Sequence, residues 1–536
     1  MTDASAYVFE GCYPTDETIR QAFDDADLNR AVSAYRFFYP TVSIMATWKG
    51  NLDAGMVPTQ VFGILEGTPQ QLVFTPNSDT PYAGLVLDVR DGPMVVELPP
   101  GPLMCTANDL NQRWVIDMGL PGPDGGRGGK HVICGPGYGG DLPEGFYSGT
   151  ATTNRVLLLL RALARGDDMA GAIAAMKTVK VYPLRSTDSW ADPTWVNLTE
   201  LRGVDFTPVR WEDNLAYWRV LHEVVDSEPP FEEFRAFYGE LAALGIAKGQ
   251  PFDPDERMVD ILTRAAEIGR AQLRVQSFAD RRPDRVVWPG TQWEWAVLRP
   301  ENGTFDTPTY HDGHARQKWF YQAQIESPAM FRRTPGAGSL YWLGTRDVTG
   351  IYLDGGRSYP LTVPQPVPAQ LFWSITVYDA RTRSEIATEQ NKAALRSMFE
   401  LAEIDTSKPV DLHFGPTAPD GDAVSHWIQT SQKQAGSCTS ASTDRPNPLS
   451  TAAGNSRTSS PPDPPRIDHT EQIERTEGQV EVSWRAPIDG HALVIAVRRN
   501  AEECAHSPAA KCPRSAPAVR PRPPGLGRCL ELAYGT

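Results

Sequence analysis

The chain has few cysteines, no long hydrophobic run and no basic stripe, and each absence excludes a class of protein. Only seven of its 536 residues are cysteine and no two form a CxxC pair, so a disulfide scaffold or zinc ribbon is not indicated. The longest apolar run, Val156–Leu160, is far shorter than the roughly 20 residues of a membrane span. The net charge of -15 opposes nucleic-acid binding, which needs a basic face. The first residues lack the basic and apolar regions of a secretory signal, which predicts a cytoplasmic protein.

Sequence motifs for common catalytic and cofactor chemistry are also missing. There is no Gly-x-Ser-x-Gly elbow, no phosphate loop and no His-Glu-x-x-His, so we predict neither a cofactor nor a metal centre. His311 and His314 flank Asp312, but a metal would need a third ligand that the sequence does not offer. Asp312 is therefore predicted to cap a helix.

Residues 7–429 are rich in aromatic residues and in short apolar runs separated by Gly, Pro and Asp. Apolar spacing predicts a helix from Thr15 to about Trp48, kinked or ended at Pro40. Short apolar runs with turn residues between them predict strands on either side of a helical middle. The predicted strands are Val61–Leu65, Gln71–Phe74, Ala83–Val89, Met94–Leu98, Trp114–Met118, His131–Cys134, Val179–Leu184, Trp293–Leu298, Tyr341–Thr345, Tyr359–Val363, Phe372–Tyr378 and Val410–Phe414. The predicted helices of the middle and after it are Trp211–Val225, Phe231–Leu244, Asp255–Phe278 and His314–Glu326.

Several sequence blocks, in order, resemble a bacterial family with paired domains of unknown function 1254 and 1214. The blocks are Phe74–Tyr82 (Phe-Thr-Pro-Asn-Ser-Asp-Thr-Pro-Tyr), Leu87–Arg90, Asp117–Gly119, Thr345–Asp347 and Phe372–Asp379. The resemblance covers roughly residues 15–430. It implies an α+β fold, mainly β, with two jelly-roll-like β-sandwich domains and an α-helical connector.

The expected domains are residues 1–190, the connector 191–285 and the second domain 286–430, followed by a tail at 431–536. The tail is rich in Pro, Ser, Thr and Arg, and we predict that it is disordered. Its apolar islands are Val480–Trp484 and Leu493–Val497.

The tail also lacks the aromatic strand and the Phe-Asp-Gly-x-Trp-Lys element with which the family ends. Read two bases along, the codons of residues 436–443 permit Trp-Phe-Val-Tyr-Phe-Arg-Ile-Tyr, and those of 450–455 permit Asp-Gly-Ser-Trp-Lys. We therefore interpret the tail as frameshifted; a natural low-complexity extension is the alternative. Loss of the last strand would leave an open sheet edge, which favours a homo-oligomer.

Polar side chains cluster between two apolar strands in the first resembling block. Asp79 and Tyr82 are the predicted catalytic residues, and Asn77 and Thr80 are predicted to bind a ligand. The alternative is a turn before Pro81 in which these side chains bond their own backbone.

Arg346 and Asp347, beside a predicted hairpin, are further candidates for ligand binding. The alternative for them is a surface ion pair. The predicted function is binding of a polar small molecule or a glycan. A hydrolase using carboxylates such as Asp79 is the alternative, and the sequence leaves open whether the chain is an enzyme.

Overall fold

The computed structural model describes residues 7–164, 166, 168–185, 190–333, 338–369, 371–431, 483–484 and 493–501. All of these residues belong to one compact unit, Met1–Glu502.

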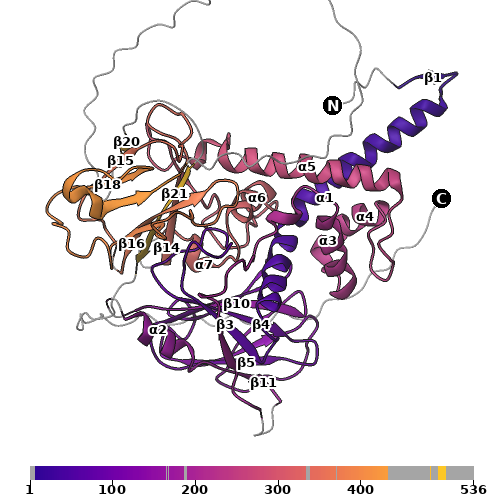
Figure 1. Cartoon of the computed structure of the whole chain (residues 1–536). Coiled ribbons are helices and arrows are strands. Elements are labelled where there is room, and N and C mark those ends of the chain that lie inside the picture. Colours follow the sequence, from indigo (N-terminus) through magenta and orange to yellow (C-terminus); the bar gives the residue numbers. More distant parts are fainter. Residues whose placement is uncertain are drawn as a thin grey trace, which may run out of the picture. The chain divides into compact units, whose positions relative to one another are not determined.

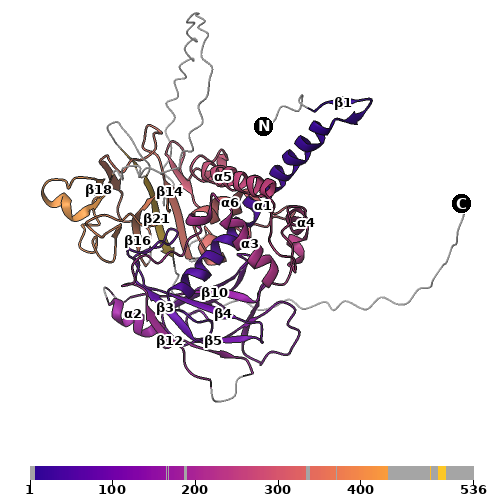
Figure 2. The ribbon, with the colours of Figure 1, turned by 45° about the vertical axis from the view of Figure 1, so that its right-hand side comes forward.

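Most of the helices lie close together in Figure 1, and their side chains share one hydrophobic core. The helices are α1 (Asp16–Asp53), α2 (Met169–Met176), α3 (Ala216–Ser227), α4 (Arg235–Ala243), α5 (Glu256–Phe278), α6 (Gly313–Gln322) and α7 (Pro328–Phe331). Tyr35 of α1, Trp218 of α3 and Leu262 of α5 are fully or almost fully buried in that core. Helix α5 lies against α1, as Figure 2 also shows. Of the described helices, none combines the length and the apolar character needed to cross a bilayer.

Helix α1 begins where the sequence predicts and passes through its proline. The Thr15 side chain caps it by accepting a hydrogen bond from the Thr18 N–H at 3.3 Å. Pro40 was expected to kink or end the first segment, but the helix continues to Asp53. Residues 38–46 are all buried, so packing on every side offsets the backbone hydrogen bond that a proline removes.

Two sheets form the N-terminal sheet pair. The six-stranded sheet has the order β12-β3-β4-β10-β6-β7 and the four-stranded sheet the order β11-β5-β8-β9. The strands are β3 (Val61–Leu65), β4 (Tyr82–Asp88), β5 (Met94–Leu98), β6 (Leu103–Asp109), β7 (Trp114–Gly119), β8 (Gly129–Cys134), β9 (Tyr147–Thr150), β10 (Arg155–Ala162), β11 (Lys180–Pro183) and β12 (Thr194–Asn197). A small hairpin, β1 (Phe9–Glu10) and β2 (Tyr13–Pro14), precedes α1.

The two faces of the six-stranded sheet pack into different hydrophobic cores. Leu158 and Leu160 of β10 pack into a core that side chains of both sheets share, for example Val96 of β5. Leu157 and Leu159 point to the opposite face and pack against the helical core. This alternation is the two-residue period of a strand, and it leaves the second face available for a site.

The C-terminal sheet pair is built in the same way from sheets β13-β14-β21-β16-β17 and β19-β18-β15-β20. Its strands are β13 (Trp293–Trp295), β14 (Gly338–Gly344), β15 (Tyr359–Val363), β16 (Trp373–Asp379), β17 (Ala394–Arg396), β18 (Val410–Gly415), β19 (Trp427–Gln429), β20 (Ser483–Trp484) and β21 (Leu493–Ala501). Ile375 of β16 and Leu412 of β18 meet in one core. The mixed α+β fold with sheets dominant is thus confirmed, while jelly-roll connectivity stays a prediction.

Two short strands lie within the tail that was predicted to be disordered. β21 pairs antiparallel with β14 and with β16, and β20 pairs with β15. These strands coincide with the two apolar islands of the tail, whose β-branched residues suit a sheet. The two apolar islands, which the sequence sets apart from the rest of the tail, thus contain strands. The residues on which the frameshift interpretation rests, 436–455, lie outside the described residues.

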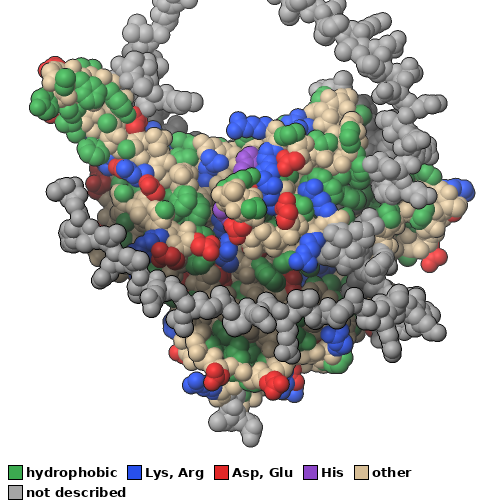
Figure 3. Space-filling model, turned by 180° about the vertical axis from the view of Figure 1, so that it is seen from behind, with side chains coloured by type: hydrophobic (Ala, Val, Ile, Leu, Met, Phe, Trp, Pro, Cys, Tyr) green, Lys and Arg blue, Asp and Glu red, His purple; other side chains and the backbone are tan. Residues whose placement is uncertain are grey.

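One predicted strand is absent. Residues Gln71–Phe74 make only an isolated bridge, Leu72 to Asp205. The Val73 N–H donates to the Ser384 side chain at 3.1 Å and not to a neighbouring strand. The predicted strand Trp293–Leu298 is shorter in the structure, where β13 ends at Trp295. The other predicted strands match more closely, and Val61–Leu65, Met94–Leu98 and Tyr359–Val363 match at both ends. On the face seen in Figure 3, acidic and basic side chains are interspersed among apolar ones.

Candidate functional site

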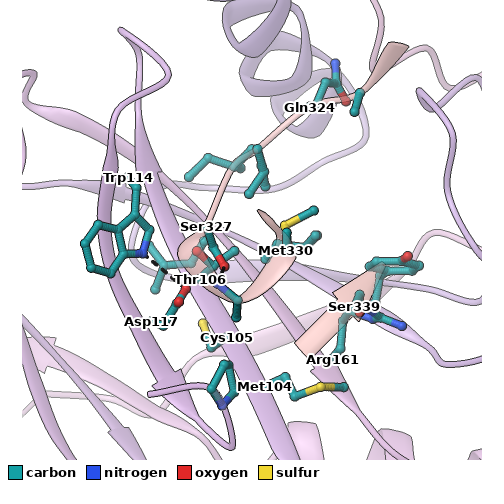
Figure 4. A pocket seen from close by; sticks show the side chains of 18 of the residues that line it. Met104, Cys105, Thr106, Trp114, Asp117, Arg161, Gln324, Ser327, Met330 and Ser339 are labelled. Carbon is teal, nitrogen blue, oxygen red and sulfur yellow. Dashed lines mark hydrogen bonds between the residues drawn. The ribbon is translucent and has the colours of Figure 1, made fainter. Parts of the chain in front are cut away.

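A cavity of about 810 Å³ lies on the face of the six-stranded sheet that carries Leu157 and Leu159. One wall comes from β4, β6, β7 and β10. Other parts of the lining come from α1, the loop before β4, α6, the segment that follows α6 through α7, and β14. Figure 4 shows part of this lining. Both sheet pairs and the helical core thus contribute to a single site.

Apolar side chains make most of the lining. They include Leu157 and Leu159 of β10, Met104 of β6, Phe206 and Trp319. Removing such a surface from water is favourable by about 25 cal/mol for each Å². The cavity therefore suits a molecule with an apolar body.

The Asp117 carboxyl forms a polar centre in one part of the wall. Burial raises its pKa to about 6, although several donors act in the opposite direction. Trp114 Nε1 donates to Asp117 Oδ1 at 3.1 Å, and the Thr106 and Ser327 hydroxyls also interact with the carboxyl. Figure 4 shows Trp114, Thr106 and Ser327 gathered around Asp117. This carboxyl can change its protonation state near neutral pH.

The Arg161 guanidinium forms a second polar centre. Its Nε donates to Thr80 Oγ1 at 2.8 Å, and its Nη2 donates to Asn77 Oδ1 at 3.3 Å. The same group lies 5.0 Å from the ring centroid of Tyr82. Three residues of the first sequence block thus hold one arginine at the cavity, and Tyr82 and Arg161 both line it.

Asp79 has a different environment from its neighbours in the sequence. It is fully buried, and the Ser374 hydroxyl of β16 donates to its Oδ2 at 2.7 Å. It is not among the residues that line the cavity. The loop before it docks on the C-terminal sheet pair, where the Tyr378 hydroxyl donates to the Pro76 carbonyl at 2.6 Å and the Thr75 N–H donates to the Arg383 carbonyl at 2.8 Å.

Arg346 and Asp347 bond within their own turn. Arg346 Nη1 donates to the Gly350 carbonyl at 2.8 Å, and its guanidinium lies 3.7 Å from the ring centroid of Tyr352. Asp347 Oδ1 accepts from the Thr349 N–H at 2.8 Å. Neither residue lines the cavity, so the structure does not bring them together with Tyr82.

The predicted capping role of Asp312 is confirmed. Its side chain caps α6 by accepting from the Ala315 N–H at 3.0 Å. The two flanking histidines face different carboxylates, His311 on Asp306 at 2.7 Å and His314 on Asp280 at 3.2 Å. Within the part of the chain that the structure describes, no cluster of His, Cys, Asp and Glu could hold a metal ion.

Sequence reasoning did not propose Asp117 or Arg161 as site residues. Asp117 lies in a block that carried the family resemblance, within an otherwise apolar strand. Arg161 interrupts the apolar run of β10 at an alternate position. A charged residue on one face of a buried strand is the signal that could have found both.

Comparison with models of protein families finds two matching domains in the chain. Residues 61–183 match the protein of unknown function DUF1254, and residues 338–439 match the protein of unknown function DUF1214. Matches to both domains are thus present in the chain, in the order that the sequence blocks predict. No curated protein matches the chain.

Two solved structures are similar to the chain. The crystal structure of the VPA0106 protein from Vibrio parahaemolyticus has a TM-score of 0.50 at 14% identity, over 89% of this chain and 96% of that one. A crystal structure of an uncharacterised protein from Burkholderia cenocepacia has a TM-score of 0.34 at 11% identity, over 77% of this chain and 89% of that one. The first likeness supports the fold and carries no function.

Proposed function

We propose that the chain binds a small organic molecule with a mainly apolar body in the cavity on the six-stranded sheet. The observation that carries this is the cavity itself, about 810 Å³ with a mostly apolar lining and two polar centres. Ligand sites in proteins commonly have volumes of roughly 300–1,000 Å³ and combine apolar walls with a few placed polar groups.

The lining refines the ligand that the sequence predicts. A glycan or another highly polar molecule needs a hydrogen-bond partner for most of its groups, since an unsatisfied polar group in an apolar site costs free energy. The aliphatic wall of Leu157, Leu159 and Met104 offers no such partners. We therefore favour an amphipathic small molecule over a glycan.

The hydrolase alternative would use Asp117 rather than Asp79, because only Asp117 lines the cavity. Cys105, a potential nucleophile in the lining, is buried, and burial raises the pKa of its thiol. A thiol that stays protonated is a poor nucleophile. These observations favour binding over covalent catalysis.

A titration with Nile red, a neutral dye that fluoresces in apolar surroundings, tests the proposal. The full chain should bind the dye saturably. Leu159→Trp should lower the affinity about tenfold or more, because the larger side chain fills the space between the walls. Val275→Trp is the matched control. It introduces the same tryptophan away from the cavity, on α5, where Val275 is 63% exposed.

Equal dye binding by Leu159→Trp and the parent chain would contradict the cavity as the site. Circular dichroism spectra of both variants should match the parent, so that a change in binding is not confused with a change in fold.

A further inference from the structure

We propose that the cavity selects an amphipathic carboxylate, whose carboxyl group pairs with Arg161 while its apolar tail lies along the sheet face. This inference rests on the proposed function and adds the charge of the ligand to it. The carboxyl end could belong to a fatty acid or to an aromatic acid, because both present the same group to a guanidinium.

The partners of Arg161 leave its charge uncompensated. Thr80 and Asn77 accept two of its hydrogen bonds through neutral oxygens, and Tyr82 supplies a ring face. Among the residues that the structure describes, none pairs a carboxylate with Arg161. A half-buried cation in an apolar lining is costly without a counter-charge, and a bound anion would supply one.

The geometry of the guanidinium suits a carboxylate. Its planar fork has five N–H donors, of which the Thr80 and Asn77 contacts use one each. These two contacts also fix the orientation of the plane before any ligand arrives. A carboxylate can then accept two parallel hydrogen bonds from the remaining donors, the geometry for which arginine is preferred over lysine.

Among the described residues, Asp117 carries the only carboxyl in the lining, and it lies away from Arg161. On the sheet, Thr106 is paired with both Asp117 and Leu159, while Met104 is paired with Arg161. Asp117 and Arg161 are therefore two strands and two residues apart, which puts their Cα atoms about 12 Å from each other. Figure 4 shows the two side chains in separate parts of the cavity.

A second arginine supports the same preference. Arg332, which follows α7, also lines the cavity and is exposed. The polar lining thus has two guanidinium groups against one carboxyl whose pKa burial raises to about 6. An anionic group is favoured on the side of Arg161, and a hydrogen-bond donor on the side of Asp117.

The test uses three probes of equal chain length: decanoate, decanol and decylamine, each titrated calorimetrically into the full chain at pH 7.5. Decanoate should bind at least about tenfold more tightly than decanol or decylamine, since only the carboxylate can form charge-assisted hydrogen bonds with Arg161. Arg161→Met replaces the guanidinium with an uncharged, apolar side chain. It should abolish the preference for decanoate while decanol binds as before.

Two further variants separate a direct role from a structural one. Thr80→Val removes the acceptor of Arg161 Nε and should weaken decanoate binding severalfold without affecting decanol, as expected of a positioning residue. Arg346→Met is the matched control, because Arg346 does not line the cavity and should leave all three titrations unchanged. Equal binding of decanoate and decanol, or an unchanged preference in Arg161→Met, overturns the inference and leaves the proposed function standing. Absence of binding by all three probes and by Nile red overturns both.

Discussion

The Ser374 hydroxyl donates a hydrogen bond to Asp79 Oδ2 at 2.7 Å, and both residues are fully buried. Ser374 belongs to β16, whereas Asp79 lies in the loop before β4, so the bond joins the two sheet pairs. The carboxylate that the sequence singled out for catalysis thus contacts the other sheet pair and not the cavity. Its position supports a role in holding the two sheet pairs together.

We predict that Asp79→Asn lowers the free energy of unfolding by about 1–3 kcal/mol, because the amide replaces the carboxyl group that accepts from Ser374 in a buried site. Urea unfolding followed by tryptophan fluorescence measures this. Nile red binding should be retained. Ser374→Ala removes the donor and serves as the partner variant in a double-mutant cycle, which isolates the bond between the two side chains. Unchanged stability together with lost dye binding would support the catalytic interpretation instead.

The buried pair of Glu212 and Arg383 provides a second prediction. The Arg383 guanidinium pairs with Glu212, and the Tyr39 hydroxyl donates to Glu212 Oε1 at 2.5 Å. Glu212→Gln should lower the free energy of unfolding by about 3 kcal/mol or more, because it leaves a buried cation without its counter-charge.

The control for this variant is Glu232→Gln. Glu232 pairs with Arg235 on the surface, where the side chains are 81% and 79% exposed, so little change is expected. Thermal melts of the two variants side by side make the comparison. A similar shift in both would show that burial of the Glu212 pair does not decide its contribution.

Asp117 should make stability depend on pH. Its pKa is raised from the ordinary 3.8 to about 6 in the folded chain. Between these values the folded state holds a proton that the unfolded state has lost, so this group's contribution to stability is present below about pH 4 and is lost as the pH rises through 6. The total change is about 3 kcal/mol at 1.36 kcal/mol for each pKa unit.

Asp117→Asn removes this titration. The stability of the variant relative to the parent should therefore increase from pH 4 to pH 6 and stay level above pH 7. Chemical unfolding at four pH values tests the slope. A parallel pH dependence in parent and variant would show that Asp117 titrates in its ordinary range.

Removal of β21 should weaken the C-terminal sheet pair. This strand pairs with β14 on one side and with β16 on the other, so without it the two neighbours lose their shared partner. A chain that ends after Ser431 should melt at a lower temperature and associate through the open edges. A chain that ends after Glu502 keeps β21 and is the matched control. Equal melting and equal light scattering of the two truncations would show that β21 is dispensable.

The sequence alone determined most local structure. Thr15 and Asp312 cap helices as their side chains predict, and the apolar runs of β3, β5 and β15 match at both ends. These features depend on neighbours within a few residues, which is why spacing and residue type are sufficient to predict them. The two domains of unknown function were also identified from ordered blocks of residues.

Only the tertiary structure decided which polar residues share a site. Four polar residues lie within six positions of the sequence, yet their partners differ. Asn77, Thr80 and Tyr82 contact Arg161. Asp79 instead contacts Ser374. Arg161 and Ser374 are distant in the sequence, so no local pattern could reveal either pairing. Pro40 illustrates the same limit, because burial on all sides keeps α1 continuous where local propensity would end it. The fold of most segments follows from short-range chemistry, whereas the cavity exists because long-range packing brings separate strands and loops together.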